Sequence, residues 1–209
     1  EKEELQLNLL EYVIEKLKTS SIRVITVEFS SKINGSVHLF KSIGFKNIKS
    51  IFQSWEGLII PKEEIDIEPF DVRRVKSTDL DITYEWIKNQ LDRSSPLFIT
   101  KETYTSLLLG PSSLRDGWAI ATIDDKPIAF VSSLKEEKSD VVVVFGPYCD
   151  ESYVNVRIPL LNELFLHYKI RGYEYVRILR IDLFENDLEL FDAFDLRKNE
   201  EILSMTKLI

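Results

Sequence analysis

Several residue types are scarce in this chain, and each scarcity excludes a class of protein. A single cysteine, Cys149, rules out an internal disulfide, and one cysteine with two histidines provides no zinc-site spacing. No apolar run approaches the roughly 20 residues of a membrane-spanning helix, and no charged and then apolar leader resembles a signal peptide. We therefore expect a cytoplasmic protein without a metal site and without membrane association.

Positive charge is also in short supply, because 27 lysines and arginines stand against 35 acidic residues and leave a net charge of -8. Broad nucleic-acid binding needs a basic face that displaces counterions from phosphates, so we expect no nucleic-acid partner. The charge suits a basic or neutral substrate. With 44% hydrophobic and 30% charged residues, the composition is that of a globular protein without long disordered segments.

Residues 141–173 read as a strand, an irregular loop and an amphipathic helix. Four valines and then Phe145 favour a strand that is covered on both faces and ends at Gly146. The helix has Pro159 in its first turn and Gly172 just past its end. Its apolar positions have helical spacing, at Leu161, Leu164, Phe165 and Tyr168. A strand that leads into a helix N-terminus is a place where phosphate-bearing ligands bind.

Residues 1–60 can be laid over residues 152–209 with one offset of 151 residues and no gap, which places Leu10 on Leu161. A sustained apolar register with few identities is the signature of a repeated structural unit. Each copy is predicted to contain a helix, a strand, a short helix and a final strand. The identical pairs include Leu9/Leu160, Lys18/Lys169, Leu39/Leu190, Phe40/Phe191 and Ile51/Ile202.

The predicted domains follow from this repeat. Residues 1–60 would be the C-terminal part of a first unit, the acidic proline-bounded residues 61–69 a linker, and residues 70–209 a complete second unit. The second unit adds a strand near 70–75, two helices near 77–91 and 101–109, and strands at 118–123 and 128–134. The first copy cannot bury its strand alone. We expect it to rest on the second copy, on another chain as in a homodimer, or on about 80 residues that precede Glu1.

The order of elements in the second copy resembles that of the GNAT acyltransferase superfamily. Residues Ser36–Lys46, SVHLFKSIGFK, also resemble the family's Ala-x-x-Leu-Tyr-x-x-x-Gly-Phe-x segment. The resemblance implies an α/β (α+β) fold with a mixed central sheet flanked by helices, in a tandem arrangement. It also implies transfer of an acyl group from acetyl-CoA or another acyl-CoA to the amine of a small molecule or peptide.

The family's pyrophosphate loop, Arg/Gln-x-x-Gly-x-Gly/Ala, falls on Ser152–Arg157, where both glycines are missing. Arg157 either clamps phosphate in place of the lost N–H donors or fills the cradle and pairs with Asp150 or Glu151. In the first copy the equivalent loop carries carboxylates, which oppose phosphate binding. The cofactor-binding residues that the resemblance implies are Val143, Val144 and Phe145 for pantetheine, and Ser152, Asn155, Val156, Arg157 and Ile158 for phosphate.

No catalytic residue can be assigned from the sequence. The tyrosine that returns a proton to the departing thiolate in this family is replaced by Phe40 in the first copy and by Phe191 in the second. A base would come from Asp182, from Glu185 or from water. Cys149 has no neighbour that would lower its pKa. The alternative hypothesis is therefore an inactive GNAT-fold module for binding or dimerisation.

Overall fold

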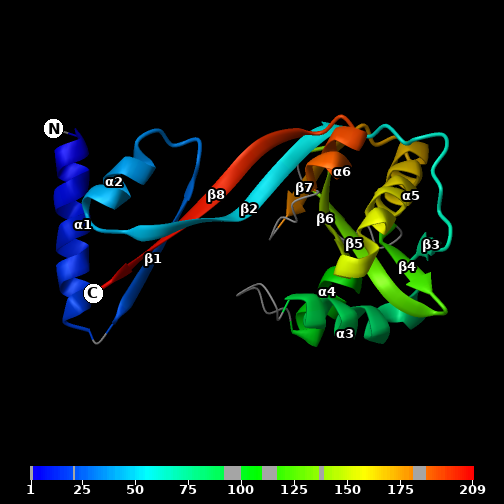
Figure 1. Cartoon of the computed structure of the whole chain (residues 1–209), viewed down its shortest axis with the longest axis horizontal. Helices are drawn as coiled ribbons and strands as arrows, with labels where there is room; N and C mark the ends of the chain where they lie inside the picture. Colours follow the sequence, from blue (N-terminus) through cyan, green and yellow to red (C-terminus); the bar gives the residue numbers. More distant parts are fainter. Residues whose placement is uncertain (1, 21, 92–99, 110–116, 137–138, 181–186) are drawn as a thin grey trace. The chain divides into compact units, whose positions relative to one another are not determined.

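The computed structural model describes residues 2–20, 22–91, 100–109, 117–136, 139–180 and 187–209 (Figure 1). Its strands form an eight-stranded sheet in the order β1-β8-β2-β7-β6-β5-β4-β3. The chain divides into two compact units, which we call unit 1 (residues 1–53 and 200–209) and unit 2 (residues 54–199). No helix among the described residues is long and apolar enough to cross a membrane.

Unit 1 is a small layer of helices on strands. It contains α1 (Lys2–Lys18), β1 (Val24–Ser30), α2 (Ser36–Ser42), the first part of β2 (Lys46–Leu58) and the last part of β8 (Arg197–Leu208). β1 pairs antiparallel with β8, from Val24 opposite Leu208 to Ser30 opposite Ile202. The core between helices and strands is formed by Ile14, Phe29, Ile43, Phe45 and Met205.

Unit 2 contains the larger part of the sheet. Its further elements are β3 (Asp71–Arg74), η1 (Ser77–Asp79), α3 (Leu80–Leu91), α4 (Lys101–Leu109), β4 (Ala119–Ile123), β5 (Lys126–Lys135), β6 (Val141–Cys149), η3 (Glu151–Val156), α5 (Arg157–Ile170), β7 (Tyr175–Arg180) and α6 (Asp187–Ala193). Strands β3 to β6 pair antiparallel in sequence order, and β6 pairs parallel with β7. α5 makes the crossover between the two parallel strands, as parallel pairing requires.

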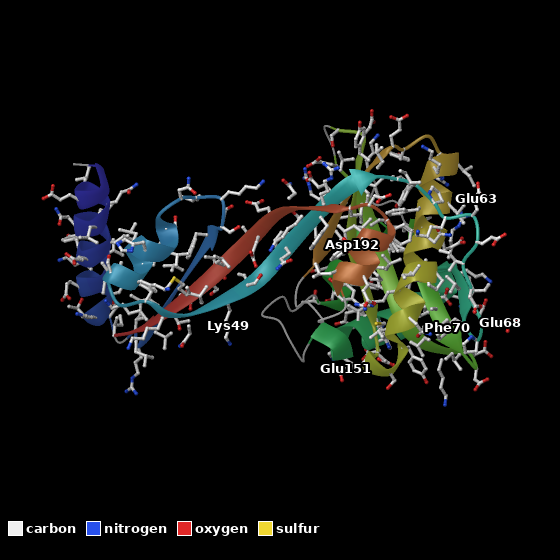
Figure 2. All side chains as sticks on the ribbon, turned by 45° about the horizontal axis from the view of Figure 1, so that its top comes forward. Lys49, Glu63, Glu68, Phe70, Glu151 and Asp192 are labelled. Carbon is white, nitrogen blue, oxygen red and sulfur yellow. The ribbon has the colours of Figure 1, made fainter. Side chains whose placement is uncertain are left out.

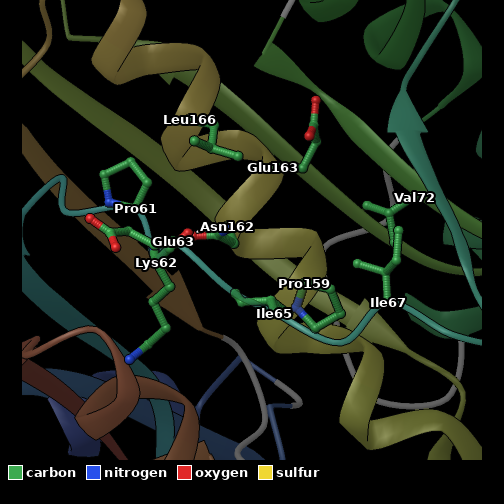
Figure 3. Close-up of a pocket in the computed structure, with 10 residues that line it drawn as sticks. All are labelled: Pro61, Lys62, Glu63, Ile65, Ile67, Val72, Pro159, Asn162, Glu163 and Leu166. Atoms are coloured by element: carbon green, nitrogen blue, oxygen red, sulfur yellow. Dashed lines mark hydrogen bonds between the residues drawn. The ribbon is translucent and has the colours of Figure 1, made fainter.

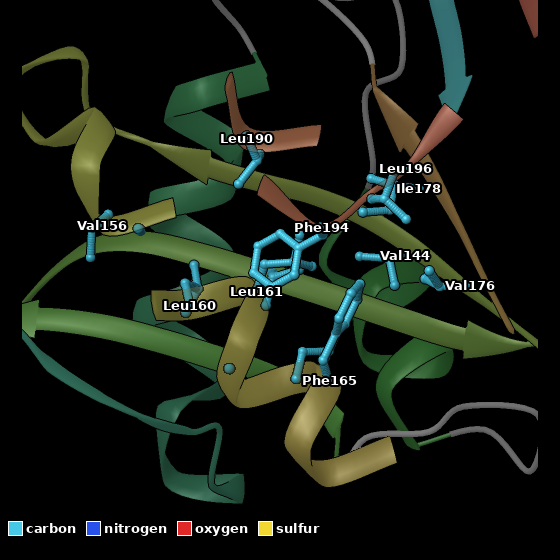
Figure 4. Packing of buried hydrophobic residues seen from close by; sticks show 14 of the residues in the cluster. Val144, Val156, Leu160, Leu161, Phe165, Val176, Ile178, Leu190, Phe194 and Leu196 are labelled. Carbon is cyan, nitrogen blue, oxygen red and sulfur yellow. The ribbon is translucent and has the colours of Figure 1, made fainter. Parts of the chain in front are cut away.

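Unit 2 has two hydrophobic cores, one on each face of the sheet, and alternate residues of a strand contribute to one or the other. Ala119 and Ala121 of β4 face the cluster under α5, whereas Trp118 and Ile120 face a second cluster that includes Tyr84 and Ile87 of α3. α5 packs on β3, β4, β5 and β6. Figure 4 shows its apolar side chains against the sheet. The largest cluster includes Leu160, Leu161, Leu164, Phe165, Tyr168, Val142, Val144, Val176 and Ile178, and all of these except Val176 have no exposed side-chain surface. This packing fixes the position of the α5 N-terminus relative to β6.

The offset of 151 residues relates the observed elements as well as the sequences. It places the first residues of β1, α2 and β2 on the first residues of β7, α6 and β8. The final strand of each half lies with the opposite half, because β8 is the neighbour of β1 and β2 is the neighbour of β7. The units therefore differ from the predicted division at residues 61–69. A common origin of the two halves stays a prediction.

Residues at the end of β2 hold its last part within unit 2. The Trp55 ring stacks on Phe191 with ring centroids 4.3 Å apart. Next to it, Glu56 accepts a hydrogen bond from Arg177 of β7, which also donates to Glu136 at 3.2 Å. The hydrogen bond to Glu56 is the main cause that raises the pKa of Arg177. An aromatic stack and a paired charge thus tie the last strand of the first half to the core of the second.

Most predicted helices and strands are present, with differences at β2, β6 and β8. β6 does not end at Gly146 but continues to Cys149, and both β2 and β8 are longer than predicted. The burial of β6 alternates, because Val142 and Val144 are buried whereas Val143 and Phe145 are half-buried. Both faces of this strand are thus covered, but one more fully than the other. A run of valines does not report how fully the helices on each side cover a strand.

Candidate functional site

The site predicted from the sequence lies where the described pairing of β6 with β7 ends. The two strands pair in parallel register from Val141 opposite Tyr175 to Phe145 opposite Leu179. Beyond Phe145, β6 continues along β5, where Tyr148 pairs with Phe130 and Cys149 with Ala129. Among the residues that the structure describes, the pairing of β6 with β7 ends at Phe145. The following segment of β6 therefore has one paired edge and one edge that faces away from β5.

A β-bulge in the pairing of β6 with β5 lies next to this point, at Gly146. From Phe130 to Ser132 the register on β5 advances by two residues while β6 goes back by three, from Tyr148 to Phe145. Gly146 has φ +98, and a Cβ there would lie 2.8 Å from the Tyr148 nitrogen. Only glycine fits both the positive φ and this close approach. The sequence carried a signal for the bulge, since glycine within a strand pattern often marks one, but it was read as the strand end.

The predicted pyrophosphate loop forms a short 3₁₀ helix that leads directly into α5. Ser152 and Asn155 are exposed, Ile158 is half-buried, and Val156 is buried in the large core cluster. Tyr153 is the non-helical position within the loop, with φ -128 and ψ 35. Glu151 in its first turn is exposed (Figure 2). Its carboxylate opposes an anion at this position, whereas the free N–H groups at a helix start favour one.

Arg157 is packed inside the protein. Its side chain is 3% exposed, and its Nε donates a hydrogen bond to the Val154 carbonyl oxygen at 3.0 Å. At least one further interaction holds it within the chain. Of the two hypotheses for Arg157, the geometry favours the one in which the guanidinium fills the cradle, because a phosphate clamp needs a guanidinium that a ligand can reach.

The position of the family's proton-donating tyrosine is closed. Phe191 has no exposed surface and stacks on Trp55 within the core, and its ring has no proton to donate. Cys149 is buried at the end of β6 and pairs with Ala129. The two carboxylates suggested as bases, Asp182 and Glu185, lie outside the described residues. Among the residues that are described, no group of three or more histidine, cysteine or acidic side chains could hold a metal ion.

A groove of about 460 Å³ lies between α5 and residues 61–67, the first part of the predicted linker (Figure 3). The buried Asn162 of α5 holds this segment in two ways. Its Oδ1 accepts a hydrogen bond from the Lys62 backbone N–H at 2.7 Å, and its Nδ2 donates to the Lys62 carbonyl at 3.3 Å. The groove is lined mainly by Ile65, Ile67, Val72, Pro159, Glu163 and Leu166. The segment is therefore a packed strap on α5.

Asn162→Ala should loosen this strap. Removal of both hydrogen bonds leaves the Lys62 backbone groups without their partner, which costs about 1–3 kcal/mol of unfolding free energy. Urea denaturation measures that loss, and limited trypsin digestion should show faster cleavage after Lys62. Asn89→Ala is the control, because Asn89 is an exposed asparagine of α3 and its replacement should change stability by less than about 0.5 kcal/mol. Equal effects of the two substitutions would contradict the proposed role of Asn162.

No protein-family model matches the chain, and no curated protein matches it. Solved structures do. The GCN5-related N-acetyltransferase from Sphaerobacter thermophilus matches with a TM-score of 0.72 and 16% identity, over 98% of this chain and 68% of that chain. The chain has the GNAT fold. This result confirms the predicted fold class.

Two further N-acetyltransferase structures match the chain. The GCN5-related N-acetyltransferase from Kribbella flavida matches over 95% of this chain and 73% of that chain, with a TM-score of 0.55 and 10% identity. The ribosomal-protein-alanine N-acetyltransferase from Brucella melitensis matches over 66% of this chain and 99% of that chain, with a TM-score of 0.51 and 13% identity. About two thirds of this chain therefore match nearly the full length of that acetyltransferase.

Proposed function

We propose that the chain is an acyl-CoA-dependent N-acyltransferase of the GNAT type, with its working site in unit 2. The observation that carries the proposal is that, among the described residues, the pairing of β6 with β7 ends next to the Gly146 bulge, a short way before η3 and the N-terminus of α5. A strand edge beside a helix N-terminus offers main-chain groups to a pantetheine arm and N–H groups to a phosphate. Both features belong to a chain with the GNAT fold.

The strand pairing limits where the pantetheine arm can bind. Val143 and Val144 lie in the part of β6 that pairs with β5 on one side and with β7 on the other. Their main-chain groups are therefore used within the sheet. In the proposal, the pantetheine amides bind the edge of β6 that follows Phe145, and the phosphates lie at the exposed Ser152 and Asn155. Val156 and Ile158 hold that turn against the core.

The proposed reaction needs few side chains. The lone pair of an acceptor amine attacks the thioester carbonyl carbon, the C–S bond breaks, and an amide forms. The amine gives its proton to water, and the departing CoA thiolate takes one from solvent. Because Phe191 cannot donate a proton, the chain contributes mainly by holding the two reactants in position. A small-molecule or peptide amine is the acceptor in this proposal.

A second candidate function is a binding module with the same fold and no catalysis. Three observations favour it: the buried Arg157, the carboxylate of Glu151 in the phosphate-binding turn, and the apolar Phe191 at the proton-donor position. The two candidates agree on the fold and differ in whether acyl-CoA binds and reacts.

Acetyl-CoA should raise the midpoint of thermal unfolding, Tm, if the first proposal holds. A ligand at 100 times its Kd stabilises the native state by about 2.7 kcal/mol, which for a chain of this size corresponds to a Tm increase of roughly 5–10 °C. Free thiol release in the presence of acceptor amines then measures turnover. No Tm shift at millimolar acetyl-CoA would contradict the acyltransferase and favour the binding module, and a shift without thiol release would contradict turnover of the acceptor amines tested.

A further inference from the structure

α1 has two apolar faces, and only one of them is covered in unit 1. Ile14, with Leu7 and Leu10, packs into the unit 1 core. The second face carries Leu5, Leu9 and Val13 at a spacing of four residues, and these side chains are 70%, 62% and 43% exposed. Tyr12 beside them is also exposed. A contiguous stripe of large exposed apolar residues on one helix indicates a surface that binds another polypeptide.

The second half of the chain shows what covers such a stripe. With the offset of 151 residues, Leu5, Leu9 and Val13 correspond to Val156, Leu160 and Leu164, all of which have no exposed surface. Those residues belong to the start of α5, which packs on β3, β4, β5 and β6. The residues of α1 keep the apolar character of their counterparts, but unit 1 has no strands equivalent to β3–β6 among the described residues.

β1 gives independent evidence for a missing neighbour, because one of its edges is unpaired among the described residues. It stands at the end of the strand order, with β8 as its neighbour. Its residues Val24–Glu28 correspond to Tyr175–Leu179 of β7, which pair in parallel with β6. Ile25 and Val27 are half-buried where their counterparts Val176 and Ile178 are buried. The unpaired edge of β1 and the uncovered face of α1 could both be covered by one structure. That structure is a sheet whose last strand pairs in parallel with β1.

We propose that the second face of α1 and the free edge of β1 dock an antiparallel sheet of the β3–β6 type, supplied by residues that precede α1 in a longer polypeptide. In unit 2, β6 leads through η3 directly into α5, and α5 leads into β7. A parallel partner for β1 that leads into α1 would make the same right-handed crossover. A second copy of the chain cannot supply this sheet, because its own β3–β6 already pack on its α5.

Substitutions at matched exposed leucines test the proposal in two forms of the protein, the 209-residue chain and the polypeptide extended to the start codon of its reading frame. Leu9→Asp changes the proposed surface, and Leu188→Asp changes a 58% exposed leucine of α6 outside it. In the extended form, Leu9→Asp should lower Tm by roughly 5 °C or more because it buries a carboxylate. In the extended form, Leu188→Asp should leave Tm nearly unchanged. In the 209-residue chain, both substitutions should leave Tm nearly unchanged.

Hydrogen exchange supplies a second readout without mutation. The amides of Val24–Glu28 that point away from β8 should be protected in the extended polypeptide and should exchange faster in the 209-residue chain. A neutral Leu9→Asp in the extended form would overturn the proposal. So would an upstream coding region of fewer than about 30 residues, which is too short for four strands of five to six residues. Dimers of the 209-residue chain that Leu9→Asp dissociates would also overturn it, since the surface would then bind a second copy.

Discussion

Gly146→Ala should destabilise the protein by about 3–4 kcal/mol and should also abolish the acetyl-CoA-induced rise in Tm. A side chain at φ +98 costs about 1–3 kcal/mol of backbone strain. The added Cβ would further lie 2.8 Å from the Tyr148 nitrogen, and such overpacking costs another 1–3 kcal/mol, roughly. If β6 relieves the contact by losing its bulge, the edge that separates from β7 is lost with it. Urea denaturation and thermal shift measure the two effects.

Gly172→Ala is the matched control. Gly172 also has a positive φ, +82, but nothing lies within 4 Å of its Cβ position. Its substitution should cost about 1 kcal/mol from strain alone and should leave the acetyl-CoA shift unchanged. If the two alanine variants were equally stable, or if Gly146→Ala kept the full ligand shift, the bulge would not be the feature that opens the site.

Arg157→Met should lower the unfolding free energy by about 2–4 kcal/mol and leave the acetyl-CoA-induced Tm shift intact. The substitution keeps side-chain volume but removes the donor to the Val154 carbonyl and a buried charge that the protein surrounds. The loss of one partner of a buried polar interaction leaves the other partner without compensation. Chemical denaturation gives the stability change, and a thermal-shift titration with acetyl-CoA gives the ligand effect.

The phosphate-clamp hypothesis predicts the reverse result for the same variant. If the guanidinium binds phosphate, Arg157→Met should keep the stability of the free protein and lose the ligand shift. Arg197→Met is the control, because Arg197 is an exposed arginine at the start of β8. Its substitution should stay within about 0.5 kcal/mol of the parent stability and should not change the ligand shift.

Local sequence patterns predicted some features of the candidate site and missed others. Helical spacing and the flanking Pro159 and Gly172 correctly predicted α5, because caps and periodicity act within a few residues of the chain. The sequence left two hypotheses open for Arg157, because its side chain could bind a ligand phosphate or fill the loop from within. Local patterns do not decide between an inward and an outward side chain. The closure of the Phe191 position by Trp55 was missed, because those residues are 136 positions apart in the chain.

By itself, the sequence determined the kinds of elements, their order and the GNAT resemblance, because periodicity, glycine and proline positions and one short segment encode them locally. The tertiary structure alone decided which strands are neighbours. β2 and β8 have equivalent places in the two halves, and either could lie beside β1 or β7 with the same local pattern. Their exchange depends on contacts between distant residues, such as Trp55 on Phe191 and Arg177 with Glu56.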